Sequence, residues 1–81
     1  MRIDDFLSTV GLIKRRTVAK EIGTSGLLEV NGRTVKPSYD VKVGDIVRIK
    51  GSHPQVAEVL DLPTRSVAKA ERDRYIKVLP V

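Results

Sequence analysis

The sequence has no cysteine and no tryptophan, and its only aromatic residues are Phe6, Tyr39 and Tyr75. Without cysteine the chain can form neither a disulfide nor a zinc–thiolate site, which fits a reducing cytosol. Three aromatic side chains are too few for the stacking platforms with which proteins read single-stranded bases. No apolar run reaches the roughly 20 residues of a membrane span, and no signal-peptide pattern opens the chain. We therefore expect a cytoplasmic protein without membrane contact.

The chain also lacks the residue sets that catalysis and metal binding need. It has no Walker-type glycine-rich phosphate loop, no Ser-His-Asp set and no cluster of metal ligands. His53, the only histidine, stands beside Pro54 in a turn pattern. Asp4 and Asp5 are neighbouring acids without another acid–base group to accompany them. We expect no enzymatic activity, no cofactor, no metal and no small-molecule substrate.

What the chain does have is an excess of positive charge. Fifteen Lys and Arg against ten Asp and Glu give a net charge of +5, with a pI near 9.9. Residues 1–50 carry ten of the basic and six of the acidic residues, whereas residues 51–81 carry five and four. This imbalance indicates a polyanionic partner, most simply nucleic acid, that binds the N-terminal part. The nearly balanced C-terminal part is expected to act as scaffold.

A first helix is predicted over residues 1–11 by an apolar stripe at positions i, i+3, i+4 and i+7. The stripe consists of Ile3, Phe6, Leu7 and Val10. Asp4 and Asp5 suit the N-terminal turn of this helix, where carboxylates are favoured by the helix dipole. Gly11 suits its exit.

A second helix is predicted within residues 12–26. Its inward face is formed by Val18, Ala19 and Ile22, which repeat at helical spacing. Arg16 and Lys20 lie four residues apart and point together to the opposite side. Gly23 and Gly26 allow the chain to leave the helix, since glycine tolerates positive φ.

The start of the second helix is poorly chosen for stability. Lys14, Arg15 and Arg16 lie where the helix dipole is positive, and each misplaced cation costs about 0.3–1 kcal/mol. No capping box compensates, because the residue three positions after Thr17 is Lys20. The free N–H groups of a helix N-terminus suit an anion. A basic run that opposes local stability without a structural gain predicts a phosphate-binding site.

Strand patterns dominate from residue 28 onwards. Residues 28–30 and 33–35 flank Asn31-Gly32, which predicts a β-hairpin because both turn residues tolerate positive φ. We interpret that turn as purely structural. Residues 46–49 predict a β-branched strand with Arg48 facing outward, and residues 56–62 predict another.

The C-terminal part predicts a short charged helix, capped by Thr64 or Ser66 and reaching about Asp73, and then a closing strand over residues 75–79. The chain is thus predicted to form a single α+β domain over residues 1–81. Two N-terminal helices would pack on a small, mostly antiparallel sheet, followed by a short helix and strand. Two short helices joined by a brief turn also fit a helix-turn-helix, so DNA binding remains an alternative, although the strand-rich sequence that follows argues against it.

The scarcity of aromatic residues favours recognition of folded RNA through its backbone and shape, with Arg and Lys contacting phosphates. Tyr39, beside Lys36 and Ser38, could also touch RNA, although a single tyrosine in a loop more commonly packs.

Several segments resemble, in order and spacing, the S4 RNA-binding domain family. They are Arg2-Ile3-Asp4 with Phe6-Leu7, Lys14-Arg15-Arg16 with Ala19-Lys20, then Gly26, Val30-Asn31-Gly32 and residues 41–46. The resemblance covers a core of about residues 1–50, with residues 51–81 as an extension. Many members have serine where this chain has Arg15. Arginine there resembles the small free-standing bacterial members related to heat shock protein 15, and the short length resembles their RqcP group of ribosome quality control proteins.

The resemblance implies an αL motif in which the second helix and the hairpin face RNA. The cations that it implies as RNA-facing are Arg2, Lys14, Arg15, Arg16 and Lys20, with Arg33 and Lys36 at the edge. It further implies that Asp4 orients a neighbouring arginine, where the charge pattern alone predicts only a cap. The ribosome quality control group implies binding to the large ribosomal subunit, with contacts to 23S rRNA and peptidyl-tRNA, in support of the tailing of stalled nascent chains. We expect a monomer.

S4 domains also occur as appendages of pseudouridine synthases, tRNA synthetases and RNA methyltransferases, and in structural ribosomal proteins. Both remain alternatives. An 81-residue chain that begins with Met favours a free-standing RNA-binding adaptor.

Overall fold

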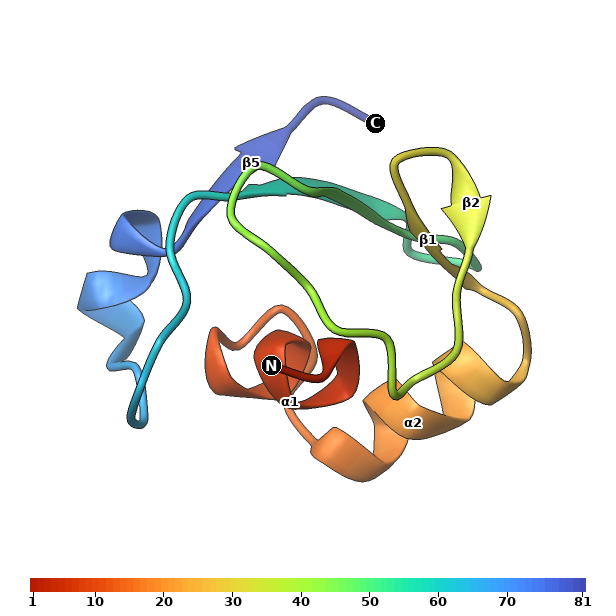
Figure 1. The fold of residues 1–81 in the computed structure, drawn as a ribbon, viewed down its shortest axis with the longest axis horizontal. Coiled ribbons are helices and arrows are strands. Elements are labelled where there is room, and N and C mark those ends of the chain that lie inside the picture. The colour runs from red at the N-terminus through yellow and green to blue at the C-terminus, as the bar shows by residue number, and fades with distance from the viewer.

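The computed structural model covers residues 1–81 and shows two helices beneath a curved antiparallel sheet (Figure 1). The helices are α1 (Ile3–Thr9) and α2 (Arg16–Thr24). The strands are β1 (Leu28–Val30), β2 (Arg33–Thr34), β3 (Ile46–Ile49), β4 (Gln55–Val59) and β5 (Ile76–Leu79). They form one five-stranded sheet in the order β2-β1-β3-β4-β5. A short 3-10 helix, η1 (Lys69–Arg74), precedes the last strand. The predicted α+β class is confirmed, and no helix has the length and apolar character needed to cross a bilayer.

The core lies between the sheet and α1. The predicted stripe of α1 is confirmed, because Ile3, Phe6 and Leu7 are fully buried and Val10 is nearly so. Side chains from the facing side of the sheet complete the core. They are Leu28, Val30, Val47, Ile49, Ala57, Val59 and Ile76. Alternate residues of each strand point to one side of a sheet, so this face meets the helices while Arg48 faces outward, as predicted.

The second helix buries a narrower face than predicted. Ala19 is fully buried and Ile22 is partly buried, but Val18 is 40% exposed, so its assignment to the inward face was wrong. Ala19 and Gly23 are the buried residues of α2. Residues four apart lie on one face of a helix, so Ala19 and Gly23 define the face of α2 that packs on the core. Val18 lies at the side of that face.

Gly23 does not end α2, contrary to the prediction. It lies inside the helix, and a Cβ atom built on it would lie 2.6 Å from Cγ of Pro37. Glycine is therefore needed there so that the segment around Pro37 can approach the helix closely. Gly26 has φ +77° and Gly11 has φ +80°, so both act at helix exits as predicted.

The hairpin forms as predicted, with Asn31 at φ +52° and Gly32 at φ +84°. The Asn31 side chain also donates from Nδ2 to Asp45 Oδ1 at 3.1 Å and accepts at Oδ1 from the Ile46 N–H at 3.0 Å. These bonds join the turn to the start of β3. Asn31 is therefore a structural residue in more ways than its turn pattern indicated.

The C-terminal helix differs from its prediction. It begins after Ala68, has no side-chain cap from Thr64 or Ser66, and is a 3-10 helix that buries none of its residues. A short charged segment without an apolar face gains too little from packing to sustain an α-helix. The strand predicted over residues 56–62 ends at Val59, and the closing strand is confirmed as β5.

Candidate nucleic-acid interface

All seven cations that the sequence singled out are exposed to solvent. Only two of them, Arg2 and Arg16, form ion pairs within the chain. The other five carry charge that no carboxylate in the structure neutralises; they are Lys14, Arg15, Lys20, Arg33 and Lys36. Such uncompensated positive charge favours an anionic partner.

Arg2 is held in place by Asp4. Its Nε donates to Oδ1 of Asp4 at 3.1 Å, and its Nη2 donates to Oδ2 at 3.0 Å. The Asp4 side chain is fully buried, while the Arg2 side chain is 45% exposed. A two-point bond to a buried carboxylate fixes the plane of the guanidinium and leaves its remaining N–H groups facing solvent.

Arg16, at the first position of α2, reaches back to the start of α1. Its Nε lies 2.9 Å from Oδ1 of Asp5 and 4.0 Å from Oδ2 of Asp4. The two acids of α1 therefore link Arg2 and Arg16 into one cluster. Each of the two acids is thus paired with an arginine, Asp4 with Arg2 through two hydrogen bonds and Asp5 with Arg16 through an ion pair.

A groove of about 350 Å³ lies between α2 and the segment of residues 36–38. Three basic residues line it together, namely Arg2, Lys20 and Lys36, with Gly23, Thr24, Pro37 and Ser38. They come from the start of α1, the middle of α2 and the loop after β2, and no carboxylate lines the groove. We call this the α2 groove. The resemblance implied that Lys36 lies at the edge of the site. The structure instead places Lys36 in the same groove as Arg2 and Lys20.

The α2 groove depends on the close approach at Gly23. With Pro37 against the helix, the preceding Lys36 and the following Ser38 are placed over the same turn of α2 as Lys20 and Thr24. Sequence patterns gave no sign of this contact, since it joins segments more than a dozen residues apart. Thr24 and Ser38 were missed as groove-lining residues for that reason.

The start of α2 matches its prediction in part. Arg15 is the N-cap residue, its side chain caps nothing, and the first turn contains no acidic residue. The free N–H groups there remain available to an anion. Lys14, however, does not line the α2 groove but a separate hollow beside η1. The consecutive cations Lys14, Arg15 and Arg16 therefore do not all lie on one surface.

Arg33 and Tyr39 do not line the α2 groove. Arg33 is on the edge strand β2 and lines neither the α2 groove nor the hollow beside η1. Tyr39 is 36% exposed, and its carbonyl accepts the Ile3 N–H at 2.7 Å, so its backbone helps to fix the start of α1. The N-terminal ammonium forms an ion pair with Asp40, and this pair also holds the start of the chain in place. The same ammonium lowers the pKa of the Asp40 carboxyl.

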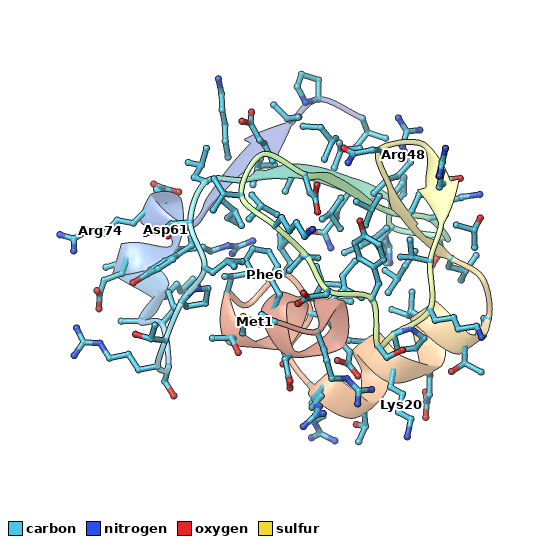
Figure 2. The ribbon with its side chains drawn as sticks, in the orientation of Figure 1. Met1, Phe6, Lys20, Arg48, Asp61 and Arg74 are labelled. Carbon is cyan, nitrogen blue, oxygen red and sulfur yellow. The ribbon has the colours of Figure 1, made fainter.

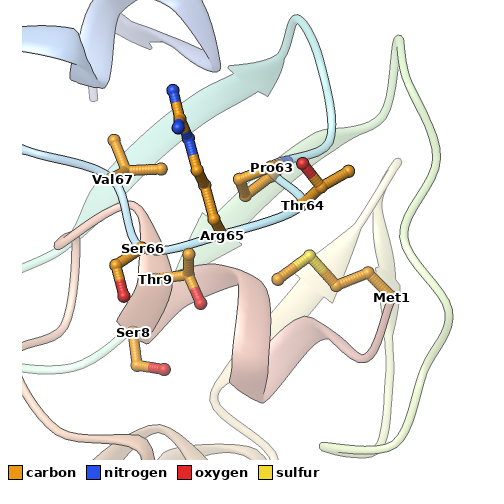
Figure 3. Close-up of a pocket in the computed structure, with 8 residues that line it drawn as sticks. All are labelled: Met1, Ser8, Thr9, Pro63, Thr64, Arg65, Ser66 and Val67. Carbon is orange, nitrogen blue, oxygen red and sulfur yellow. The ribbon is translucent and has the colours of Figure 1, made fainter.

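The largest hollow in the structure has a different character. It measures about 490 Å³ and lies between α1 and residues 63–67 (Figure 3). Arg65 is the one charged side chain in its lining, and it extends away from the hydroxyls of Ser8 and Ser66. No group of three or more metal-ligating side chains occurs in the molecule. This hollow therefore holds one cation in its lining, whereas the α2 groove holds three.

Comparison with known proteins identifies the family. The S4 domain model matches residues 1–47, which confirms the resemblance seen over about residues 1–50. A Helicobacter pylori protein (strain J99) named RQC P-site tRNA stabilizing factor is 39% identical over 94% of this chain and 93% of its own length. A Streptococcus pneumoniae protein of the same name is 44% identical over 76% of this chain and 72% of its own.

Solved structures agree on the fold. The solution structure of a hypothetical protein superimposes with a TM-score of 0.83 at 32% identity, covering 100% of this chain and 99% of that one. Heat shock protein 15 of Vibrio cholerae superimposes with a TM-score of 0.87 over 98% of this chain and 81% of its own, and at 20% identity it shows a shared fold. The chain therefore belongs to the S4 domain family.

Proposed function

We propose that this protein is a non-catalytic RNA-binding adaptor of the large ribosomal subunit. It contacts 23S rRNA and peptidyl-tRNA and stabilises the P-site tRNA during quality control of stalled nascent chains. The α2 groove carries this proposal, because it gathers Arg2, Lys20 and Lys36 from three separate segments without a carboxylate. The name shared by two relatives, RQC P-site tRNA stabilizing factor, supports the same role.

The mechanism is electrostatic and depends on preformed geometry. Arg2 is fixed by its two bonds to Asp4, so little side-chain freedom is lost when its outer N–H groups bind a phosphate. Lys20 and Lys36 add point charges on either side of the groove. Such binding releases counterions, so the affinity should fall steeply as salt rises.

The proposal includes action in the cytoplasm, as a monomer and without a cofactor or small-molecule substrate. The H. pylori relative supports a free-standing role, because this chain spans 93% of its length and leaves little room there for a catalytic domain. S4 family membership favours RNA over the helix-turn-helix alternative. Competition between duplex DNA and structured RNA at fixed salt tests that preference directly.

Co-sedimentation from a cell lysate at moderate salt tests the ribosomal role. We expect the tagged protein to travel with large subunits, enriched in those that carry peptidyl-tRNA. Equal amounts on all ribosomes would instead indicate a structural ribosomal protein. A protein that stays at the top of the gradient would overturn the ribosomal assignment.

Matched single substitutions test the α2 groove itself. Lys20→Ala should weaken binding to purified large subunits. It should also reduce the steepness of the dependence of log K on log salt by about one. Arg48→Ala is the control, because it removes the same charge from the exposed outer side of the sheet, and Figure 2 shows Arg48 and Lys20 at opposite sides of the molecule. Equal effects of the two substitutions would remove Lys20 from the interface.

A further inference from the structure

A second basic groove lies between the end of α1 and η1. It measures about 340 Å³. Its eight lining residues are Ser8, Thr9, Val10, Gly11, Lys14, Val67, Lys69 and Arg72. Three of these residues are cations, two carry hydroxyl groups and none is acidic. We call this hollow the η1 groove.

The geometry of η1 explains why the groove is basic although the helix as a whole is not. In a 3-10 helix, side chains at positions i and i+3 eclipse one another. Lys69 and Arg72 therefore share one edge of η1, while Asp73 lies on a second and Glu71 with Arg74 on a third. Two of the three cations of η1 thus share an edge that carries no acid, whereas the third, Arg74, lies on the same edge as Glu71. A count of charges along the sequence does not show this grouping.

The three cations have no structural task within the chain. Lys14, Lys69 and Arg72 form no ion pair and donate no side-chain hydrogen bond. Three carbonyl groups near the end of α1 need no donor from these side chains. The carbonyls of Phe6, Leu7 and Ser8 already accept backbone N–H groups at 3.0 to 3.2 Å.

We propose that the η1 groove is a second binding site for the RNA phosphodiester backbone, which gives the C-terminal part a role in recognition. Lys69 and Arg72 supply the charge on one wall, and the hydroxyls of Ser8 and Thr9 supply donors on the other. Lys14 directly precedes the α2 N-cap and lines this groove, so it joins the new site to the start of α2. The inference rests on the proposed RNA-binding function and adds a surface to it.

The test compares two double variants that remove equal charge. Lys69→Ala/Arg72→Ala empties the η1 groove of two cations, whereas Arg74→Ala/Lys77→Ala removes two exposed cations from the adjacent edge of η1 and from β5. Binding of fluorescently labelled protein to purified large subunits carrying a P-site tRNA is followed by anisotropy across a series of KCl concentrations. The negative slope of log K against log salt should become shallower by about two for the groove variant relative to wild type. The control variant should change this slope by much less.

The possible results distinguish failure of the η1 groove as a site from failure of the proposed function. Equal effects of the two double variants would overturn the η1 groove as a site while leaving the proposed function intact, since only overall charge would matter. Wild-type protein that fails to bind the subunits would overturn both. Lys69 is exposed, so Lys69→Glu provides the same comparison if the double variant melts at a low temperature. Combining Lys20→Ala with Lys69→Ala should give additive losses, because the two residues line separate grooves.

Discussion

Both oxygens of the buried Asp4 carboxylate accept hydrogen bonds from the half-exposed guanidinium of Arg2, at 3.1 and 3.0 Å. A buried charge is tolerated only when it is paired and hydrogen-bonded, and Arg2 supplies that pairing to Asp4. In turn, Asp4 fixes Arg2 at the rim of the α2 groove. Asp4 therefore positions a cation of the proposed interface, as the family resemblance implied. The charge pattern alone had predicted only a cap for the helix.

Asp4→Asn separates this positioning role from simple electrostatics. The substitution removes a negative charge, which by itself should strengthen binding to RNA. We expect weaker binding instead, because Arg2 loses the two-point acceptor that orients its guanidinium. The free energy of unfolding should fall by about 1.5–3 kcal/mol, the range for hydrogen bonds to charged groups. Chemical denaturation and RNA-binding titrations measure the two effects.

Glu21→Gln is the matched control for that substitution. Glu21 is exposed on α2 and forms no ion pair, so its neutralisation changes the charge without changing any contact. It should leave stability nearly unchanged and strengthen RNA binding slightly. If Asp4→Asn bound RNA as tightly as Glu21→Gln, the positioning role of Asp4 would be rejected.

Arg15→Glu should raise stability and weaken RNA binding at the same time. Arg15 is the N-cap of α2 with no cap hydrogen bond, and a carboxylate suits that end of the helix dipole. A gain of about 0.3–1 kcal/mol is expected in thermal or chemical unfolding. Arg15→Gln removes the charge without reversing it and should give a smaller change of each kind. A clear drop in melting temperature for Arg15→Glu would show that the cation is structural.

Local patterns were sufficient to predict the elements that depend on near neighbours. The apolar stripe of α1 and the Asn31-Gly32 hairpin formed as predicted, because helix period and turn conformation are encoded within a few residues. The inward face of α2 was predicted less well. Its direction depends on Gly23 and Pro37, whose contact joins distant segments.

The two grooves illustrate the same limit for the site. The charge pattern predicted a phosphate site at residues 14–16, and the family resemblance implied the full set of seven cations. Neither showed that Lys36 lies with Lys20 or that Lys14 lies with Lys69. The α2 groove requires the close approach of Pro37 to Gly23, and the η1 groove requires a 3-10 helix that places Lys69 and Arg72 on one edge. Neither arrangement was predicted from the sequence.

Substitutions at Asn31 test whether its role is only structural. Asn31→Gly keeps the positive φ but loses the bonds to Asp45 and Ile46, and should cost about 0.5–1.5 kcal/mol for each net hydrogen bond. Asn31→Ala loses the bonds and also strains the turn, so it should be less stable than Asn31→Gly. Both folded variants should bind RNA like the wild type at a temperature well below their melting points. Reduced affinity of the folded Asn31→Gly protein would instead place the hairpin at the RNA.

Gly23→Ala tests how the α2 groove is built. Helix propensity alone predicts a gain of up to about 1 kcal/mol, since alanine is the better helix former. We expect a net loss of roughly 1–3 kcal/mol, because the new Cβ would lie 2.6 Å from Cγ of Pro37 and must displace the segment that carries Lys36. RNA affinity should fall as well, since Lys36 then moves away from Lys20.

Pro37→Ala supplies the matched rescue. It removes the Cγ atom that Gly23→Ala would strike, so the double variant should recover stability relative to Gly23→Ala alone. A coupling free energy clearly different from zero in the double-mutant cycle is the expected result, because the two residues are in direct contact. If the two effects simply added, the close approach at Gly23 would not be what sets the shape of the groove. Recovery of RNA affinity in the double variant would further show that Lys36 acts through its placement beside α2.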